Sequence, residues 1–215
     1  MTALSDRPAG DCAVGPTRLL PLLPDISGEK DAPVPRPMAG GVCACCGLDA
    51  GKRWQGMRAG HLVDHAVCTL CYLTGHLDSP TAGHGRLAWL PGLEIAHAQH
   101  LQRRALLAIL AGDRSQRQEG KRLWRYLVLH AREVEGAWGT ARASEFAGAL
   151  KRLPPSKRSR LQRGLADCVL ILPPDLFDDL TLLLPRGKSP AAALTSWCRG
   201  TYIRSDLYAE PDPLG

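Results

Sequence analysis

The chain has 215 residues, of which 45% are hydrophobic and 22% charged, and its formal net charge is +6. This length is enough for one ordinary domain, or for a small module joined to a larger one. No apolar run reaches the roughly 18 to 20 residues of a membrane span. Asp6 and Pro8 interrupt the start, where a signal peptide needs an apolar stretch. We therefore expect a cytoplasmic protein that does not insert into a membrane.

Residues 1–41 are rich in proline, which cannot continue a helix or a central strand, so this segment is predicted to be an extended tether. Its most apolar part, TRLLPLLP at 17–24, is predicted to dock as a short strand or extended piece on the domain that follows. Residues 42–92 are dense in Gly, Cys and His, and they predict loops and short strands.

Two cysteine pairs, Cys43-x-x-Cys46-Gly and Cys68-x-x-Cys71, are separated by 21 residues. A C-x-x-C turn points two thiolates at one site, and a glycine after the second cysteine permits the tight turn. Two such turns complete the tetrahedron that zinc prefers, and four thiolates leave no coordination position for water or substrate. The spacing therefore predicts one structural zinc ion held by these four cysteines. A redox dithiol would need a βαβ setting, which the sequence does not predict.

Cys45 stands beside Cys46, and the two thiols could exchange roles. Only Cys43 with Cys46 has the usual spacing and the following glycine, so Cys45 is predicted to be a packed thiol without metal. His61 is a possible substitute ligand if one thiol is displaced.

Asp64 and His65 lie between the cysteine pairs. An Asp-His pair inside a zinc module is typical of HNH endonucleases, where the histidine activates a water molecule. The HNH pattern also has room for a helix carrying an Asn after that histidine, and a His directly after the second C-x-x-C. Here only two residues intervene, and Tyr72 follows Cys71. With no phosphate loop or nucleophile elbow in the chain, we expect a protein that is not an enzyme.

From residue 93 the pattern is helical. Apolar residues recur at helical spacing over 93–111, before Gly112, and a capping-box pattern at 115–118 begins a second predicted helix over 118–135. Shorter helices are predicted at 144–153 with Ser144 as the cap, at 156–171, within 173–185, and from Pro190 with Ser189 as the cap.

Two basic stretches lie in this part of the chain, at 103–126 and 151–163, and the second holds six cations and no acid. Such runs usually form a solvated face. Where they bind a partner, an acidic protein segment is favoured over nucleic acid, because no interleaved aromatic residues mark a base-stacking platform.

The succession of five motifs resembles the IcmJ (DotN) family of type IVB secretion and related conjugation systems. The motifs are CACCG, CTLC, GRLAWLPGLEIAHAQHL, GTARASEFAGAL and LFDDLTLLLPRGKSPAAALTSW. The likeness covers residues 42–199. It implies a zinc-bound, HNH-like fold without nuclease activity, with Cys43, Cys46, Cys68 and Cys71 as the zinc ligands.

The resemblance also implies an adaptor in the coupling complex, peripheral to the inner membrane through its partners. Such an adaptor binds the C-terminal extension of the coupling ATPase, contacts other coupling-complex proteins and helps substrate recruitment. The predicted fold class is α+β. A small zinc-bound module, HNH-like or zinc-ribbon-like, at 42–92 precedes a mainly α-helical domain at 93–203, with the tether at 1–41 and a tail at 204–215.

We expect a partner helix or extended peptide to dock in an apolar groove rimmed by arginine. The predicted anchors, which could equally belong to the core, are Leu90, Leu93, Trp124, Trp138 and Trp197. Two alternative functions stay open. One is a nucleic-acid-binding zinc protein, similar in outline to the zinc-bearing subunit of the flagellar master regulator. The other is a degenerate HNH nuclease.

Overall fold

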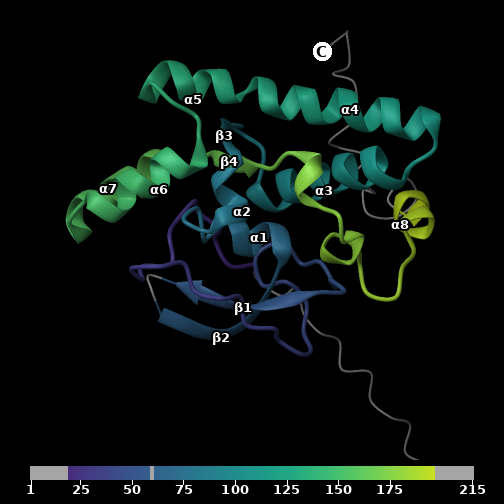
Figure 1. The fold of residues 1–215 in the computed structure, drawn as a ribbon, viewed down its shortest axis with the longest axis horizontal. Helices are drawn as coiled ribbons and strands as arrows, with labels where there is room; N and C mark the ends of the chain where they lie inside the picture. The colour runs from purple at the N-terminus through teal and green to yellow at the C-terminus, as the bar shows by residue number, and fades with distance from the viewer. Residues whose placement is uncertain (1–18, 59–60, 197–215) are drawn as a thin grey trace, which may run out of the picture.

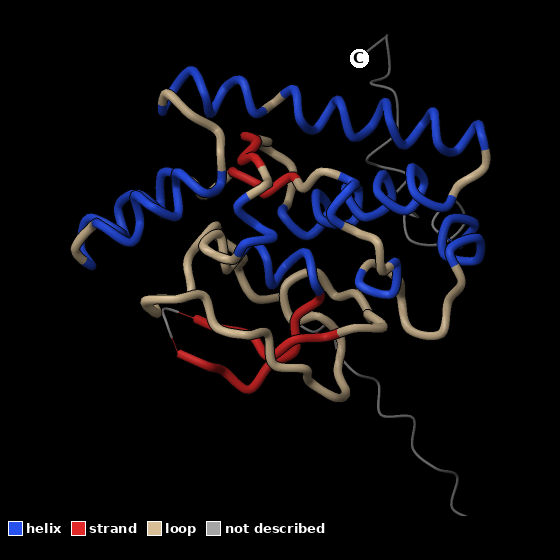
Figure 2. The backbone as a smooth tube through the Cα atoms, in the orientation of Figure 1, coloured by secondary structure: helices blue, strands red, loops and turns tan. Residues whose placement is uncertain are grey.

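Short strands and helices alternate through the first half of the chain, and helices dominate the second half (Figures 1 and 2). The computed structural model describes residues 19–58 and 61–196. The elements are β1 (Arg53–Arg58), β2 (His61–Cys68), α1 (Thr69–Thr74), α2 (Pro80–Gly83), β3 (Arg86–Trp89), α3 (Ile95–Ala111), α4 (Arg114–Leu129), α5 (Ala131–Trp138), α6 (Ala143–Arg152), α7 (Pro155–Gly164), β4 (Cys168–Ile171) and α8 (Pro190–Ser196). The predicted mixture of helices with short strands is therefore confirmed.

The first sheet is an antiparallel pair of β1 and β2, in which Arg53 lies opposite Cys68. Its register shifts at Gly56, where a Cβ atom would collide with the ring of His65 on β2. β2 continues directly into α1. The end of the hairpin is therefore also the beginning of a helix.

The second sheet corrects the prediction of a helix over 156–171. α7 ends at Gly164, and the fully buried β4 follows. β4 pairs antiparallel with β3, with Leu87 opposite Leu170. A buried run of four residues cannot be assigned to strand or helix from periodicity alone, because its partner strand lies far away in the sequence. This sheet joins the predicted zinc module to the helical domain.

α3 and α4 form an antiparallel hairpin with only Gly112 and Asp113 between them. The predicted capping box at 115–118 lies two residues too late. Asp113 and Gln116 form the box, because the Gln116 N–H donates to Asp113 Oδ1 at 2.9 Å and the Asp113 N–H donates to Gln116 Oε1 at 3.0 Å. A Cβ atom on Gly120 would lie 2.8 Å from that of Ala108. The glycine therefore lets the two helices approach closely.

The helix predicted over 118–135 is divided at His130 into α4 and α5. The carbonyl of His130 accepts a hydrogen bond from the Trp89 N–H of β3 at 3.1 Å. This bond attaches the junction of α4 and α5 to the second sheet. Within the described ranges, no helix is long and apolar enough to cross a membrane.

Three shorter helix predictions have mixed outcomes. α6 begins at Ala143 with Arg142 at the N-cap, so Ser144 is not the cap. Residues 173–185 form two 3-10 turns, Pro174–Leu176 and Leu180–Leu182, in place of one α-helix. The cap of α8 is confirmed, because Ser189 Oγ accepts from the Ala192 N–H at 3.2 Å.

The described part of the proline-rich segment, residues 19–41, forms no helix, and its backbone is hydrogen-bonded to the rest of the protein. Leu20 N–H donates to the carbonyl of Ala44 at 2.8 Å, which confirms the docking of the described part of 17–24. Asp25 exchanges backbone hydrogen bonds with the end of α1 and with Leu77. Pro37 forms an isolated bridge with Trp54 of β1.

The buried face of α3 is partly polar. Gln102 is fully buried, and its amide donates to the Leu170 carbonyl at 2.9 Å and accepts from the Leu172 N–H at 2.6 Å. This side chain therefore extends the hydrogen-bond pattern of β4 sideways into α3. Since a buried amide needs such partners, Gln102 fixes the position of α3 against the second sheet.

Candidate metal centre

Cys43 and Cys46 lie on a tight turn closed by backbone hydrogen bonds. The Gly47 N–H donates to the Cys43 carbonyl at 2.8 Å, and the Cys43 N–H donates to the Leu48 carbonyl at 2.8 Å. Gly47 has a φ of 72°, a left-handed conformation that glycine adopts without steric cost. Gly47 thus permits the tight turn after the second cysteine, as the sequence predicts.

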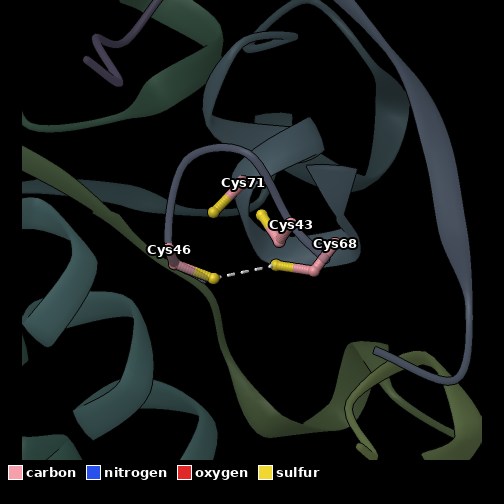
Figure 3. Close-up of side chains that lie close together, drawn as sticks. All are labelled: Cys43, Cys46, Cys68 and Cys71. Carbon is pink, nitrogen blue, oxygen red and sulfur yellow. Dashed lines mark hydrogen bonds between the residues drawn. The ribbon is translucent and has the colours of Figure 1, made fainter. Parts of the chain in front are cut away.

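Cys68 and Cys71 come from the junction of β2 and α1. Cys68 is the last residue of the strand and the N-cap of the helix, and Cys71 lies in the first helical turn. The direct change from strand to helix turns both side chains toward the Cys43–Cys46 turn (Figure 3).

The four sulfur atoms converge on one point between these two segments (Figure 3). They all lie within 4.8 Å of one another, and Cys46 Sγ is 3.6 Å from Cys68 Sγ. Tetrahedral coordination with metal–sulfur bonds of about 2.3 Å requires sulfur–sulfur distances of roughly 3.8 Å. All four residues are buried. The group therefore fits a single structural metal ion, held by the four cysteines that the sequence predicts.

Without a metal, the four thiols compete for protons. Hydrogen bonds from Cys45 first, and then from Cys46, Cys68 and Cys71, lower the pKa of Cys43. The hydrogen bond to Cys43 is the main cause that raises the pKa values of Cys46 and Cys71. A metal ion therefore has to displace protons from Cys46 and Cys71 when it binds.

Arg103 of α3 is a residue of this centre that the sequence analysis did not identify. Its side chain is fully buried, and Nη2 donates to Cys68 Sγ at 2.9 Å. Burial opposes the charge on the guanidinium, but the charges of the surrounding cysteines, Cys68 first, raise the pKa of Arg103 overall. A divalent ion with four thiolates carries a net charge of about −2, which Arg103 partly neutralises.

His100 lies one turn before Arg103 on the same face of α3. Its Nε2 is 2.8 Å from the Cys46 carbonyl, and its Nδ1 is 3.5 Å from Arg103 Nη1. Burial, with a smaller contribution from Arg103, lowers the pKa of His100 to about 4. The neutral ring therefore donates from Nε2 to the cysteine turn and presents Nδ1 to the guanidinium. This arrangement orients Arg103 toward the sulfur atoms.

Cys45 is buried but does not belong to the group of four. Its hydrogen bond to Cys43 is the main cause that raises the pKa of Cys45 to about 12. This position is consistent with the prediction of an unligated thiol. Cys45 lines a cleft of about 230 Å³ between the proline-rich segment and α1, together with His65 and His76.

The Asp-His pair does not form a common site. Asp64 and His65 are consecutive in β2, so their side chains leave opposite faces of the strand. Asp64 is exposed, whereas His65 is half-buried over Gly56. The side chain of His61 lies outside the described part of the structure.

The predicted partner anchors are distributed between core and surface. Leu90 is 5% exposed and belongs to the core. Leu93 and Trp124 are half-buried, and the Trp124 indole N–H donates to a backbone carbonyl after β4 at 2.9 Å. Trp138 is 46% exposed. Trp197 lies outside the described residues.

No protein-family model matches the sequence, and no curated protein matches it significantly. The assignment of a function therefore rests on the geometry of the site and on the motifs of the sequence.

Proposed function

We propose that this protein is a non-catalytic, zinc-stabilised adaptor of a type IVB secretion or conjugation system, similar to the IcmJ (DotN) family. In this role it binds the coupling ATPase, contacts other coupling-complex proteins and helps to recruit substrates. It acts at the cytoplasmic face of the inner membrane, where its partners hold it.

The closure of the metal site is the observation that carries this proposal. Four buried sulfur donors satisfy a tetrahedral ion, and the buried guanidinium of Arg103 contacts one of them. A catalytic zinc needs an open position for water or substrate, and this donor set leaves none. A bound ion would therefore hold the Cys43–Cys46 turn against the start of α1 and stabilise the fold.

Zinc is the proposed ion because four thiolates in a tetrahedral arrangement are its usual structural site. The cysteine turn, the β1–β2 hairpin and α1 follow one another, and this strand–strand–helix order supports the HNH-like part of the resemblance, although α1 starts at the second C-x-x-C and not before it. Tyr72 stands directly after Cys71, where the HNH pattern has a histidine, and this departure supports the loss of nuclease function.

The adaptor proposal is tested by co-expression of the full chain with the coupling ATPase from the same secretion or conjugation system. We expect the zinc-loaded protein to capture the intact ATPase and to fail to capture an ATPase that lacks its C-terminal extension. Absence of capture, or capture that does not depend on the extension, contradicts the proposal.

The nuclease alternative is tested on the same preparation with plasmid DNA and added magnesium or manganese. We expect no cleavage. Cleavage that disappears in His65→Ala, while the zinc content is unchanged, would assign the protein to the degenerate nucleases instead.

A further inference from the structure

A groove of about 670 Å³ lies where the end of α5 meets α6 and α7. Its walls are mostly apolar, and its floor is formed by Trp138, Phe146, Ala149, Leu153 and Leu161. In Figure 1, α6 and α7 extend together along one side of the molecule, with α5 above them. The residues that line the groove come from α5, α6, α7 and their connections, which hold none of the four cysteines.

Trp138 is the most prominent side chain of this groove. Its ring packs edge to face on Phe146, with the ring centroids 6.1 Å apart and the planes at 70°. On the other side it lies over Gly164 of α7, where a Cβ atom would be 3.2 Å from the indole. The ring is thus held in place while 46% of the residue stays exposed. A fixed, half-exposed tryptophan is typical of an interface anchor.

The rim of the groove carries more cations than acids, because Lys157 and Arg160 line it and Glu145 is the one acidic residue of its lining. α7 carries Lys157, Arg158, Arg160 and Arg163, has no acidic residue, and buries none of its side chains. Lys157 and Arg160 line the groove directly. Within residues 19–58 and 61–196, neither of these two side chains forms an ion pair. We call α6 and α7 together the cationic arm.

We infer that this groove binds an amphipathic, acidic segment of a protein partner. Apolar side chains of that segment contact Trp138 and Leu161, and its carboxylates pair with Lys157 and Arg160. The inference rests on the proposed adaptor function and specifies the surface and the chemistry by which the partner is recognised. Nucleic acid is the less suitable occupant, because a phosphate backbone makes no use of an apolar floor.

The test uses the zinc-loaded full chain and two synthetic helical peptides. Both peptides carry leucine along one face, and they differ only in the flanking residues, which are glutamate in one and lysine in the other. We expect the glutamate peptide to bind and to shift the indole N–H resonance of Trp138, while the lysine peptide does not bind.

Three variants locate the binding site. Trp138→Ala should lower the affinity for the glutamate peptide by at least about tenfold, as for an interface hot spot. Trp138→Phe should retain most of that affinity. The double variant Lys157→Glu/Arg160→Glu should reverse the preference between the peptides. Tyr126→Ala is the matched control, because Tyr126 is 57% exposed on α4 and does not line the groove.

Equal binding of the two peptides, or unchanged binding in Trp138→Ala, would overturn the inference. Displacement of the glutamate peptide by duplex DNA would also overturn it, and would assign the cations of α7 to nucleic acid. Capture of the coupling ATPase by the variants tests this inference separately from the adaptor proposal. Full capture by Trp138→Ala would reject the groove and leave the adaptor, whereas peptide binding without ATPase capture would reject the proposed partner and leave the groove.

Discussion

The metal module, composed of the turn at 43–47 with β1, β2 and α1, and the cationic arm handle charge in opposite ways. Against the module, the charged side chain of Arg103 from α3 is fully buried and contacts the sulfur of Cys68. In the arm, Lys157, Arg160 and Arg163 of α7 are exposed, and the first two line the groove. A buried charge is costly unless it is paired, whereas exposed charges cost little and stay available to a partner.

Within one chain, the metal module is therefore suited to stabilising the fold, and the cationic arm is suited to binding a partner. In the module, a bound ion would link the turn at 43–47 to the start of α1 through the four cysteines. The arm buries Phe146, while Lys157 of the arm and Trp138 of the adjoining α5 stay exposed at a groove. Changes in the module should therefore act mainly on folding, and changes at the arm surface should act mainly on binding.

Loss of a metal ligand should have the largest effect. Cys71→Ser, or treatment of the wild type with a strong chelator, should remove the ion and unfold the metal module, because a structural zinc site supplies about 10–16 kcal/mol of apparent binding energy. Thermal unfolding followed by circular dichroism, together with the zinc content, measures this loss. Cys45→Ser is the control and should keep both the metal and the melting temperature. An unchanged melting temperature in Cys71→Ser would show that the metal does not stabilise the fold.

Phe146 of the arm and Trp138 beside it have rings in contact with each other. Substitution of each should distinguish a residue that stabilises the fold from a residue that binds a partner. Phe146 is 4% exposed, so Phe146→Ala should cost about 3–5 kcal/mol of unfolding free energy. Trp138→Ala removes a half-exposed ring and should cost only about 1 kcal/mol. Urea denaturation of both variants measures the difference. A loss in Trp138→Ala as large as that in Phe146→Ala would make Trp138 a core residue and not a surface anchor.

Removal of the buried guanidinium should weaken metal binding without abolishing it. Arg103→Met keeps the length of the side chain but leaves the negative charge of the four thiolates without its contact. We expect the zinc affinity to fall by about 10–100-fold, as measured by competition with a chromophoric chelator. Arg104→Met, at the neighbouring position with an ion pair to Glu119, should bind zinc like the wild type. Equal affinities in Arg103→Met and the wild type would contradict a role for Arg103 at the centre.

The smallest effect concerns His76, which follows the metal module two residues after the end of α1. Burial lowers the pKa of His76 below its ordinary value of 6.5, and its Nδ1 donates to the Tyr72 carbonyl at 2.8 Å. The unfolded chain therefore binds more protons as the pH falls below 6.5, so this histidine reduces stability in that range. A titration of the ring by nuclear magnetic resonance should have its midpoint below 6.5. A midpoint at or above 6.5 would contradict the buried, neutral ring.

Local chemistry made the metal ligands and the long helix predictable from the sequence. The spacing of Cys43 and Cys46 and the glycine that follows them constrain one turn, and the structure contains that turn. The helix predicted over 93–111 begins only two residues later, at Ile95, and ends at the predicted Gly112. Both features depend on residues that are near one another in the chain.

Features that depend on distant contacts were not predictable in the same way. β4 is a strand because β3 pairs with it, and α4 ends because the carbonyl of His130 bonds to Trp89 of β3. Arg103 belongs to a basic run that predicts a solvated face, yet it is buried because the sulfur atoms need a cation. One signal was present: Gln99 and Arg103 are four residues apart and share a helix face with Leu106. Polar residues within an apolar stripe indicate a buried polar partner.

Zinc-edge X-ray absorption of the purified full chain tests the closed metal site most directly, and the proposed function depends on that closure. The account predicts four sulfur scatterers at about 2.3 Å and no oxygen or nitrogen ligand. Three sulfurs with one light scatterer would indicate a site open to water or to histidine. That result would contradict the closed structural centre and reopen a catalytic role.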